Sequence, residues 1–307
     1  MVLDLEHIRE LLNTYGSALD VPVEPFEVSG VRFDFAHQRY VMGVINLSPD
    51  SRNKSTVCKT PEEAFARSQR LTQEGAHIID VGAESTRQYN ERVSPRAQIE
   101  RLAPVVEYNT QHNIVTSIDT YYPEVLEAGA ELGARVFNLT GARDADAAFE
   151  LAARYDAAVI ICYIQGETPR DRADYVTYDD MVPVMTDYFA ALLERAKRFG
   201  ATKCIIDPGL GFHYPNLSDD QPLGFQLEVL MSTFRFRQLG CPMLNVLPWA
   251  PHIFGGLGLE AEVYTVPIGW LGGSHIIRTH SVKETVQILR ILEACRPSRA
   301  DRVEESG

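Results

Sequence analysis

Polar and ionisable residues stand at the ends of several short apolar runs, where they could build a site for binding and chemistry. Asp207 follows the run 203–206 directly, and Pro208, Gly209 and Gly211 then turn the backbone sharply. One carboxylate in such a place is usually an Asx turn or a helix cap. The arrangement recurs, however, at the ends of most other runs, with Asn46, Glu84 to Arg87, Asp119, Asn138, Arg278 and His280.

The apolar runs that must position these residues predict parallel β-strands. They are rich in β-branched residues and are almost continuously apolar, as strands covered on both faces are. The strands are expected at 40–46, 77–83, 113–120, 135–140, 158–164, 203–209, 242–248 and 275–281.

Segments with helix signals separate most of the expected strands. One begins with Thr60 and Pro61 and stops at Gly75, and another begins with Ser94 and Pro95. Eight strand–helix units without a change in composition predict an α/β fold, a (β/α)8 TIM barrel. An open, doubly wound sheet is the alternative, but it would not usually need eight units. In a barrel, the carboxyl ends of the strands meet at one rim and form the active site.

The regions outside the barrel predict a simple domain division. Residues 1–38 are expected to form a short helix and a hairpin that closes the barrel bottom, and residues 39–296 to form the barrel. Residues 297–307 contain almost no apolar side chains and are expected to be a flexible tail.

The composition excludes some partners. With a formal net charge of −13 there is no basic surplus for a nucleic acid or an anionic membrane, although a few local arginines could still bind an anionic substrate. Five scattered cysteines fit neither a disulfide framework nor a zinc site and indicate a reducing, cytoplasmic environment. The N-terminus is too charged for a signal peptide, and no apolar run approaches the ~20 residues that span a bilayer.

Six segments resemble motifs of the dihydropteroate synthases and of the wider pterin-binding barrel family, in the family's order. They are MGVINLSPDS (42–51), GAHIIDVGAESTR (75–87), SIDT (117–120), GARVFNLTG (133–141), DPGLGF (207–212) and IIRTHSVKET (276–285). Each motif is short, but six in order are a specific signal for the fold and for a pterin site. They are less specific for the reaction.

The resemblance implies a role for three residues around the pterin ring. Asp207 would bind the N–H and the exocyclic amine of the pyrimidinone edge, two parallel donors that match one carboxylate. Asn138 would bind ring nitrogens, and Asp119 would hold the other side of the bicycle. They would orient and stabilise the ring rather than react covalently.

The resemblance also implies a site for the diphosphate of the family's substrate. Arg278 and His280, two residues apart on one strand, would point the same way and form an anion pocket. Asn46 would bind a magnesium ion or a diphosphate oxygen. The remaining family residues would belong to a mobile loop that closes over the second substrate, namely Ser85, Thr86 and Arg87.

Several residues also have structural interpretations. Asp80 is expected to be a buried acid bonded to the backbone, and Glu84 could simply pair with Arg87. The Arg278–His280 pair has an alternative as an ion network in the core. Residues expected to have no catalytic role are His77 and His275 at the barrel bottom, and Cys162 and Tyr163 in the wall.

The seventh strand departs from the family pattern. Pro248, Trp249 and Ala250 stand where family members have Ser-Arg-Lys, and no lysine lies between Lys203 and Lys283. Trp249 could instead offer a stacking face. Candidates to replace the missing cation are Arg52, Lys54 and His252.

The expected function is therefore a dihydropteroate synthase-like transferase that uses magnesium. It would join the methylene of 6-hydroxymethyl-dihydropterin diphosphate to an amine, either p-aminobenzoate or a different acceptor. One alternative is a catalytically silent pterin-binding paralogue. Another is a methyltetrahydrofolate-dependent methyltransferase, which needs no such lysine but also no diphosphate pocket. The resemblance also suggests a homodimer, because related barrels pair through outer helices. The apolar stripe of residues 282–294 could serve such a pairing, but a stripe of this kind more often packs within the chain.

Overall fold

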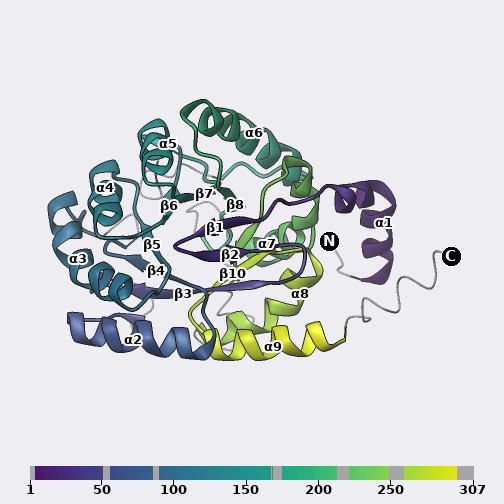
Figure 1. Cartoon of the computed structure of the whole chain (residues 1–307). Coiled ribbons are helices and arrows are strands. Elements are labelled where there is room, and N and C mark those ends of the chain that lie inside the picture. Colours follow the sequence, from purple (N-terminus) through teal and green to yellow (C-terminus); the bar gives the residue numbers. More distant parts are fainter. Residues whose placement is uncertain are drawn as a thin grey trace.

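Eight parallel strands form the centre of the protein, seen here in a computed structural model that describes residues 4–50, 56–85, 90–166, 168, 175–212, 221–248 and 259–295 (Figure 1). Each strand lies within a run that the sequence predicts to be one. The strands are β3 (Tyr40–Asn46), β4 (Ile78–Gly82), β5 (Thr116–Asp119), β6 (Val136–Thr140), β7 (Ala158–Cys162), β8 (Cys204–Asp207), β9 (Leu244–Val246) and β10 (Ile276–Thr279).

The sheet closes into a barrel. Its strand order is β8-β7-β6-β5-β4-β3-β10-β9, and the two end strands meet through a parallel bridge between Ile206 and Met243. The N–H of Ile206 also donates to the carbonyl of Pro242 at 3.0 Å. The (β/α)8 TIM barrel is therefore confirmed, and the open sheet is excluded.

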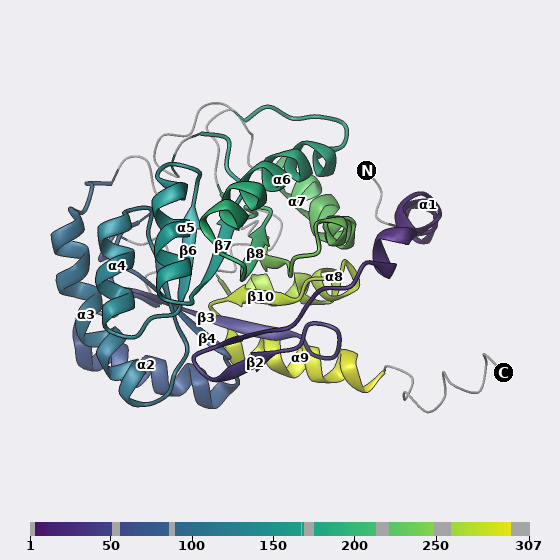
Figure 2. The ribbon, with the colours of Figure 1, turned by 45° about the horizontal axis from the view of Figure 1, so that its top comes forward.

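Helices cover the outside of the strands (Figure 2). The α-helices around the barrel are α2 (Pro61–Glu74), α3 (Pro95–Gln111), α4 (Pro123–Glu131), α5 (Ala145–Arg154), α6 (Met181–Phe199), α7 (Gln221–Met231), α8 (Val266–Leu271) and α9 (Val282–Ala294). Short 3-10 turns add η3 (Thr233–Leu239) before β9 and η4 (Leu259–Thr265) before α8. Among the described residues we find no helix with the length and apolar character needed to cross a bilayer.

The helix ends use the residues that the sequence indicates. The hydroxyl of Thr60 accepts from the N–H of Glu63, and Gly75 ends α2 in the left-handed region. Ser94 caps α3 in the same way, through the N–H of Ala97. These caps fix where each helix starts, and therefore how the following strand enters the barrel.

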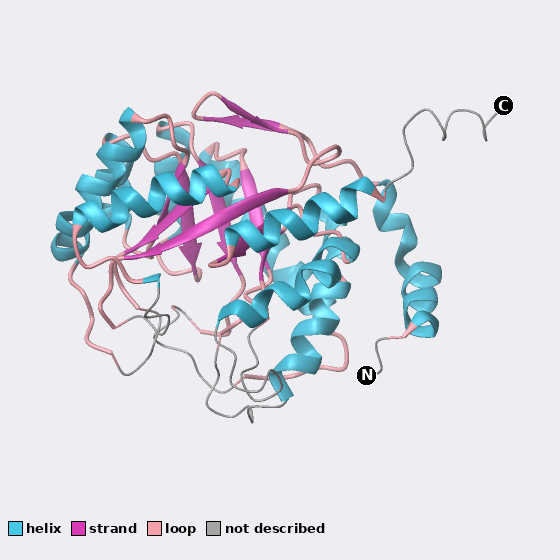
Figure 3. Cartoon of the chain, turned by 90° about the horizontal axis from the view of Figure 1, so that it is seen from below, coloured by secondary structure: helices cyan, strands magenta, loops and turns pink. Residues whose placement is uncertain are grey.

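The first residues form a helix, α1 (Leu5–Tyr15), a 3-10 turn, η1 (Gly16–Asp20), and an antiparallel hairpin of β1 (Phe26–Val28) and β2 (Val31–Phe33). Figure 3 shows the hairpin at one end of the barrel. Its side chains Val28 and Phe33, with Phe35, pack onto the first inward-facing residues of the strands, which include Met42, Ile78, Val136, Ile205 and Ile276. The bottom of the barrel is thus an apolar plug.

A polar layer lies directly above this plug. Side chains alternate along a strand, so residues two positions further on face the same interior. These positions hold Asp80 after Ile78, Asn138 after Val136, Asp207 after Ile205 and Arg278 after Ile276. The fold therefore gathers charged groups at the rim opposite the hairpin.

Candidate active site at the carboxyl-terminal rim

Arg278 is the centre of the polar layer. Its Nε and Nη2 atoms lie 2.8 and 2.7 Å from Oδ2 of Asp80, and Nη2 lies 3.2 Å from Oδ2 of Asp119. Burial alone would lower the pKa of Arg278, but the two carboxylates raise it, so the guanidinium stays charged. Asp80 is fully buried, whereas the side chains of Arg278 and Asp119 are 16% and 22% exposed. Within this group of three, Arg278 and Asp119 are the residues that are partly exposed.

This geometry corrects the interpretation of Asp80. The sequence suggests an acid bonded to backbone, but the described partners of Asp80 are side chains. Besides Arg278, the amide of Asn138 donates weakly to both carboxylate oxygens, at 3.4 and 3.3 Å. Asp80 therefore fixes the guanidinium from below and helps to orient Asn138.

Asp119 and Asn138 are paired across the neighbouring strands β5 and β6. Burial and the charge of Asp80 raise the pKa of Asp119, while Arg278 and a hydrogen bond from Thr140 lower it. A carboxylate with a raised pKa in a cleft is a frequent feature of functional sites.

Asp207 sits at the end of β8 in a turn that only glycine allows. Its Oδ1 accepts from the N–H of Gly209 at 2.8 Å, so it forms the Asx-type turn considered from the sequence. Gly209 has a φ of +72°, and a Cβ there would lie 2.0 Å from the carbonyl oxygen of Tyr163. The turn therefore fixes the direction of the carboxylate.

The environment of Asp207 disfavours its charge. Burial raises the pKa of Asp207 to about 6, although Gly209, the charge of Arg278 and the Cys162 thiol lower it. No cation is bonded to this carboxylate among the described residues. Two donors arriving from a ligand would replace the water that the buried carboxylate has lost.

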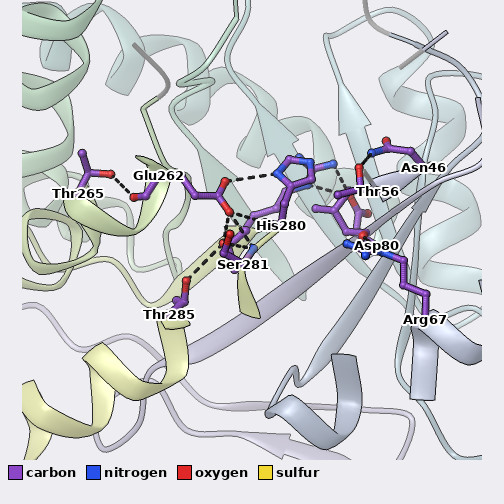
Figure 4. Close-up of polar contacts among 12 residues, drawn as sticks. Asn46, Thr56, Arg67, Asp80, Glu262, Thr265, His280, Ser281 and Thr285 are labelled. Carbon is purple, nitrogen blue, oxygen red and sulfur yellow. Dashed lines mark hydrogen bonds and ion pairs between the residues drawn. The ribbon is translucent and has the colours of Figure 1, made fainter. Parts of the chain in front are cut away.

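His280 is held by a residue that the sequence analysis missed. β10 ends at Thr279, so His280 lies just past the strand rather than on it. Its Nδ1 lies 3.3 Å from Oε2 of Glu262, which belongs to η4 (Figure 4). Arg278 and His280 thus each have a carboxylate partner, and their shared anion pocket stays a prediction. The ion pairs of Arg278 with Asp80 and Asp119 also form the buried network that the sequence offered as an alternative.

Other predicted residues occupy the same rim. The amide nitrogen of Asn46 donates to the hydroxyl of Thr56 at 2.7 Å, so the amide oxygen takes no part in this hydrogen bond. Ser85 follows β4 at the rim, beside Glu84, whose carboxylate accepts from Tyr121 at 2.6 Å and from the N–H of Val93. The remaining predicted residues lie outside the described residues: Thr86 and Arg87 of the site, with Arg52, Lys54, Trp249 and His252.

The residues interpreted as structural have structural surroundings. His77 and His275 each accept, through Nδ1, the N–H of the neighbouring strand at Val41 and Met243. Burial lowers the pKa of both imidazoles. Burial and the charge of Asp207 raise the pKa of the Cys162 thiol well above its usual value, which makes it a poor nucleophile.

The fold and the rim together define a class: a (β/α)8-barrel enzyme with a buried carboxylate–arginine network at its active-site end. Residues 42–244 match the family model described as "Pterin binding enzyme", and the chain belongs to this family. It is a dihydropteroate synthase-like transferase.

Three similar proteins are matched along nearly their whole length. The dihydropteroate synthase of Escherichia coli strain K12 is 32% identical over 284 residues, covering 89% of this chain and 97% of that protein. The Yersinia pestis dihydropteroate synthase, solved with a sulfonamide drug complex, superposes with a TM-score of 0.75 at 28% identity, over 88% of this chain and 98% of that chain. The Thermus thermophilus enzyme, in complex with 4-aminobenzoate, gives 0.74 at 27% identity, over 89% and 100%.

Proposed function

We propose that the enzyme transfers the pterin methylene group of 6-hydroxymethyl-dihydropterin diphosphate to an amine, with release of diphosphate. The single observation that carries this proposal is the buried carboxylate of Asp207, fixed by Gly209 at the mouth of the barrel with no bonded cation among the described residues. The similarity to enzymes named dihydropteroate synthase supports the same assignment.

The pterin ring is bound by hydrogen bonds from its edge. The N–H and the exocyclic amine of the pyrimidinone form two parallel bonds to Asp207. Asn138 and Asp119, adjacent on β6 and β5, bind the remaining ring nitrogens. Because Asp207 and Asn138 are buried, a heterocycle that lacks the matching groups leaves them unpaired and binds much more weakly.

The leaving group faces the cationic part of the rim. Arg278, at 16% exposure, and His280 stabilise the negative charge that develops on the departing diphosphate. In the reaction the bond from the methylene carbon to the diphosphate oxygen breaks. The amine nitrogen then bonds to that carbon and loses a proton.

A magnesium ion fits this site as a diphosphate-bound ion. Among the described residues no group of three His, Cys, Asp or Glu side chains could hold a metal. Mg²⁺ commonly takes one or two protein oxygens and completes its shell with phosphate oxygens and water. The amide oxygen of Asn46 is the residue atom that would hold it, and the ion would neutralise charge on the diphosphate.

The segment at the end of the seventh strand departs from the family pattern. Pro248 stands at the end of the seventh strand, and the segment from Lys203 to Lys283 contains no lysine between these two residues. We therefore propose an amine as the acceptor without fixing which one. p-Aminobenzoate is the first compound to test, and other primary aromatic amines are tested in parallel.

The decisive experiment measures product and diphosphate together. Purified protein is incubated with the pterin diphosphate, magnesium and p-aminobenzoate, and in parallel with other amines. The expected result is amine-dependent diphosphate release and a product whose mass is the sum of both parts. His280→Asn should lower turnover, whereas His37→Asn, at an exposed position next to the N-terminal hairpin, should not. Pterin binding without diphosphate release with any amine would reject the transferase proposal.

A further inference from the structure

Glu262 binds three consecutive residues at the end of β10. Its Oε1 accepts from the hydroxyl of Thr279 at 2.5 Å, from the N–H of His280 at 2.7 Å and from the N–H of Ser281 at 2.9 Å. Its Oε2 faces Nδ1 of His280 at 3.3 Å. One buried carboxylate thus fixes both the backbone and the ring of the histidine (Figure 4).

Glu262 is ionised in this position. Burial alone would raise the pKa of Glu262, but the hydrogen bond and charge of His280 and the bond from Thr279 bring it below its usual value. A carboxylate only accepts hydrogen bonds, so the ring nitrogen that faces it must carry a proton. The neutral imidazole of His280 therefore has its proton on Nδ1, and a second proton can be added only at Nε2.

The surroundings place this second proton on the substrate side of the ring. In the view of Figure 4 the imidazole lies between Glu262 and the Asn46–Thr56 pair at the end of β3. The charged groups described at this end of the barrel also include Arg278 with its partners Asp80 and Asp119, Asp207 at the end of β8, and Arg67 of α2, whose Nε donates to the carbonyl of Val44. Glu262 is the carboxylate whose oxygen faces the imidazole directly, at 3.3 Å, so it is placed to balance a positive charge on His280.

We propose that Glu262 is a positioning residue that fixes the Nδ1–H tautomer of His280, so that Nε2 takes up a proton when a diphosphate binds. This inference rests on the proposed function only in the identity of the anion. His280 would take the proton from solvent, present it as an N–H donor to the diphosphate oxygen, and give it to that oxygen as the carbon–oxygen bond breaks.

The first test reads the tautomer in the protein without ligand. The protein is labelled with ¹⁵N-histidine, and the His280 signals are assigned by their loss in His280→Asn. In mildly alkaline buffer the wild type should show the proton on Nδ1. Glu262→Gln keeps an oxygen acceptor for Thr279 and the two backbone N–H groups, but it presents an amide donor to the ring, so the proton should move to Nε2. Thr279→Val removes one bond to the same carboxylate and should leave the tautomer unchanged.

The second test measures how many protons the protein takes up when the anion binds. Calorimetric titrations with inorganic diphosphate and magnesium, in buffers of different ionisation enthalpy, give the number of protons taken up. The wild type and Thr279→Val should take up more protons per diphosphate than Glu262→Gln. The comparison between variants cancels the protonation of diphosphate itself.

Each result decides between separate claims. If the wild type carries the proton on Nε2, or if Glu262→Gln changes neither the tautomer nor the proton uptake, Glu262 is only a backbone anchor and the inference is overturned. If the wild type binds no diphosphate, the proposed anion site fails, while the tautomer still decides the role of Glu262. If Glu262→Gln does not fold, the tautomer of the wild type gives the answer alone.

Discussion

Arg278 binds Asp80 through two nitrogens, Nε at 2.8 Å and Nη2 at 2.7 Å from the same oxygen, although 198 residues separate them in the chain. Asp80 has no exposed surface, so the pair lies in a medium where an unpaired charge is strongly unfavourable. Asp80 thereby holds the guanidinium in the barrel while leaving it accessible from the rim. The stability of the fold and the geometry of the site depend on the same contact.

Asp80→Asn should therefore destabilise the protein strongly. Of the two acids that pair with Arg278 in the described part of the chain, it leaves Asp119, and breaking a buried pair by removing one partner costs about 3–5 kcal/mol. Urea unfolding followed by circular dichroism measures the change. Glu127→Gln is the matched control, because its pair with Arg154 lies on the surface at 2.8 Å and should contribute little. Equal effects of the two substitutions would contradict the network.

Asp207→Asn should weaken pterin binding and stabilise the ligand-free protein. Loss of the charged acceptor for two donors should lower the affinity about 10²–10³-fold. The stability sign follows from the raised pKa. Because the folded state binds the proton more tightly, the carboxyl costs the fold nothing below its unfolded pKa near 3.8. Stability is then lost as the pH rises from there through the folded pKa of about 6.

Replacing the acid removes that loss, so the free energy of unfolding near neutral pH should rise by about 1–3 kcal/mol. Calorimetric titration with a pterin and urea unfolding measure the two effects on the same sample. A variant that is less stable and binds equally well would show that the acid serves the fold alone.

The affinity for a pterin should depend on pH through the same group. The carboxylate accepts both donors, whereas the protonated acid does not, so binding requires loss of a proton whenever the pH is below about 6. Affinity should fall about tenfold per pH unit below that value and level off above it. Calorimetric titrations of the wild type with a pterin, at pH values below and above 6, measure this dependence. Asp207→Asn is the control, because its affinity should not show the tenfold fall per pH unit.

The fold was predictable because its signals are local. Apolar runs of strand length, and caps such as Thr60 and Ser94, lie within a few residues of the elements they define. Asp207 was also recognisable, because the glycine-rich turn that fixes it directly follows the strand. Motif similarity then suggested the pterin.

The partners across the barrel were not predictable in this way. The alternation of side chains along a strand predicts that Asp80 and Arg278 face the interior. It does not predict which acid meets which cation, because the two residues come from different strands, β4 and β10. Glu262 gave no signal, since it lies in η4, outside every predicted strand, and only the folded chain brings it to His280. Such contacts depend on the closure of the sheet rather than on the sequence near them.

The last prediction concerns the turn that fixes Asp207. Gly209→Ala should destabilise the protein and weaken pterin binding, because the residue has a φ of +72° and the new Cβ would meet the carbonyl oxygen of Tyr163 at 2.0 Å. Backbone atoms cannot move aside as a side-chain end can, so the turn itself must shift and carry the carboxylate with it.

Gly240→Ala separates the two causes. Gly240 has a φ of +71° but nothing within 4 Å of a Cβ, so it should show only the left-handed backbone penalty of about 1 kcal/mol. Urea unfolding should give a clearly larger loss for Gly209→Ala, and calorimetry should show weaker pterin binding for this variant alone. If both substitutions cost the same and both leave binding intact, the close approach to Tyr163 does not position Asp207, and the origin of its orientation must be sought elsewhere in the rim.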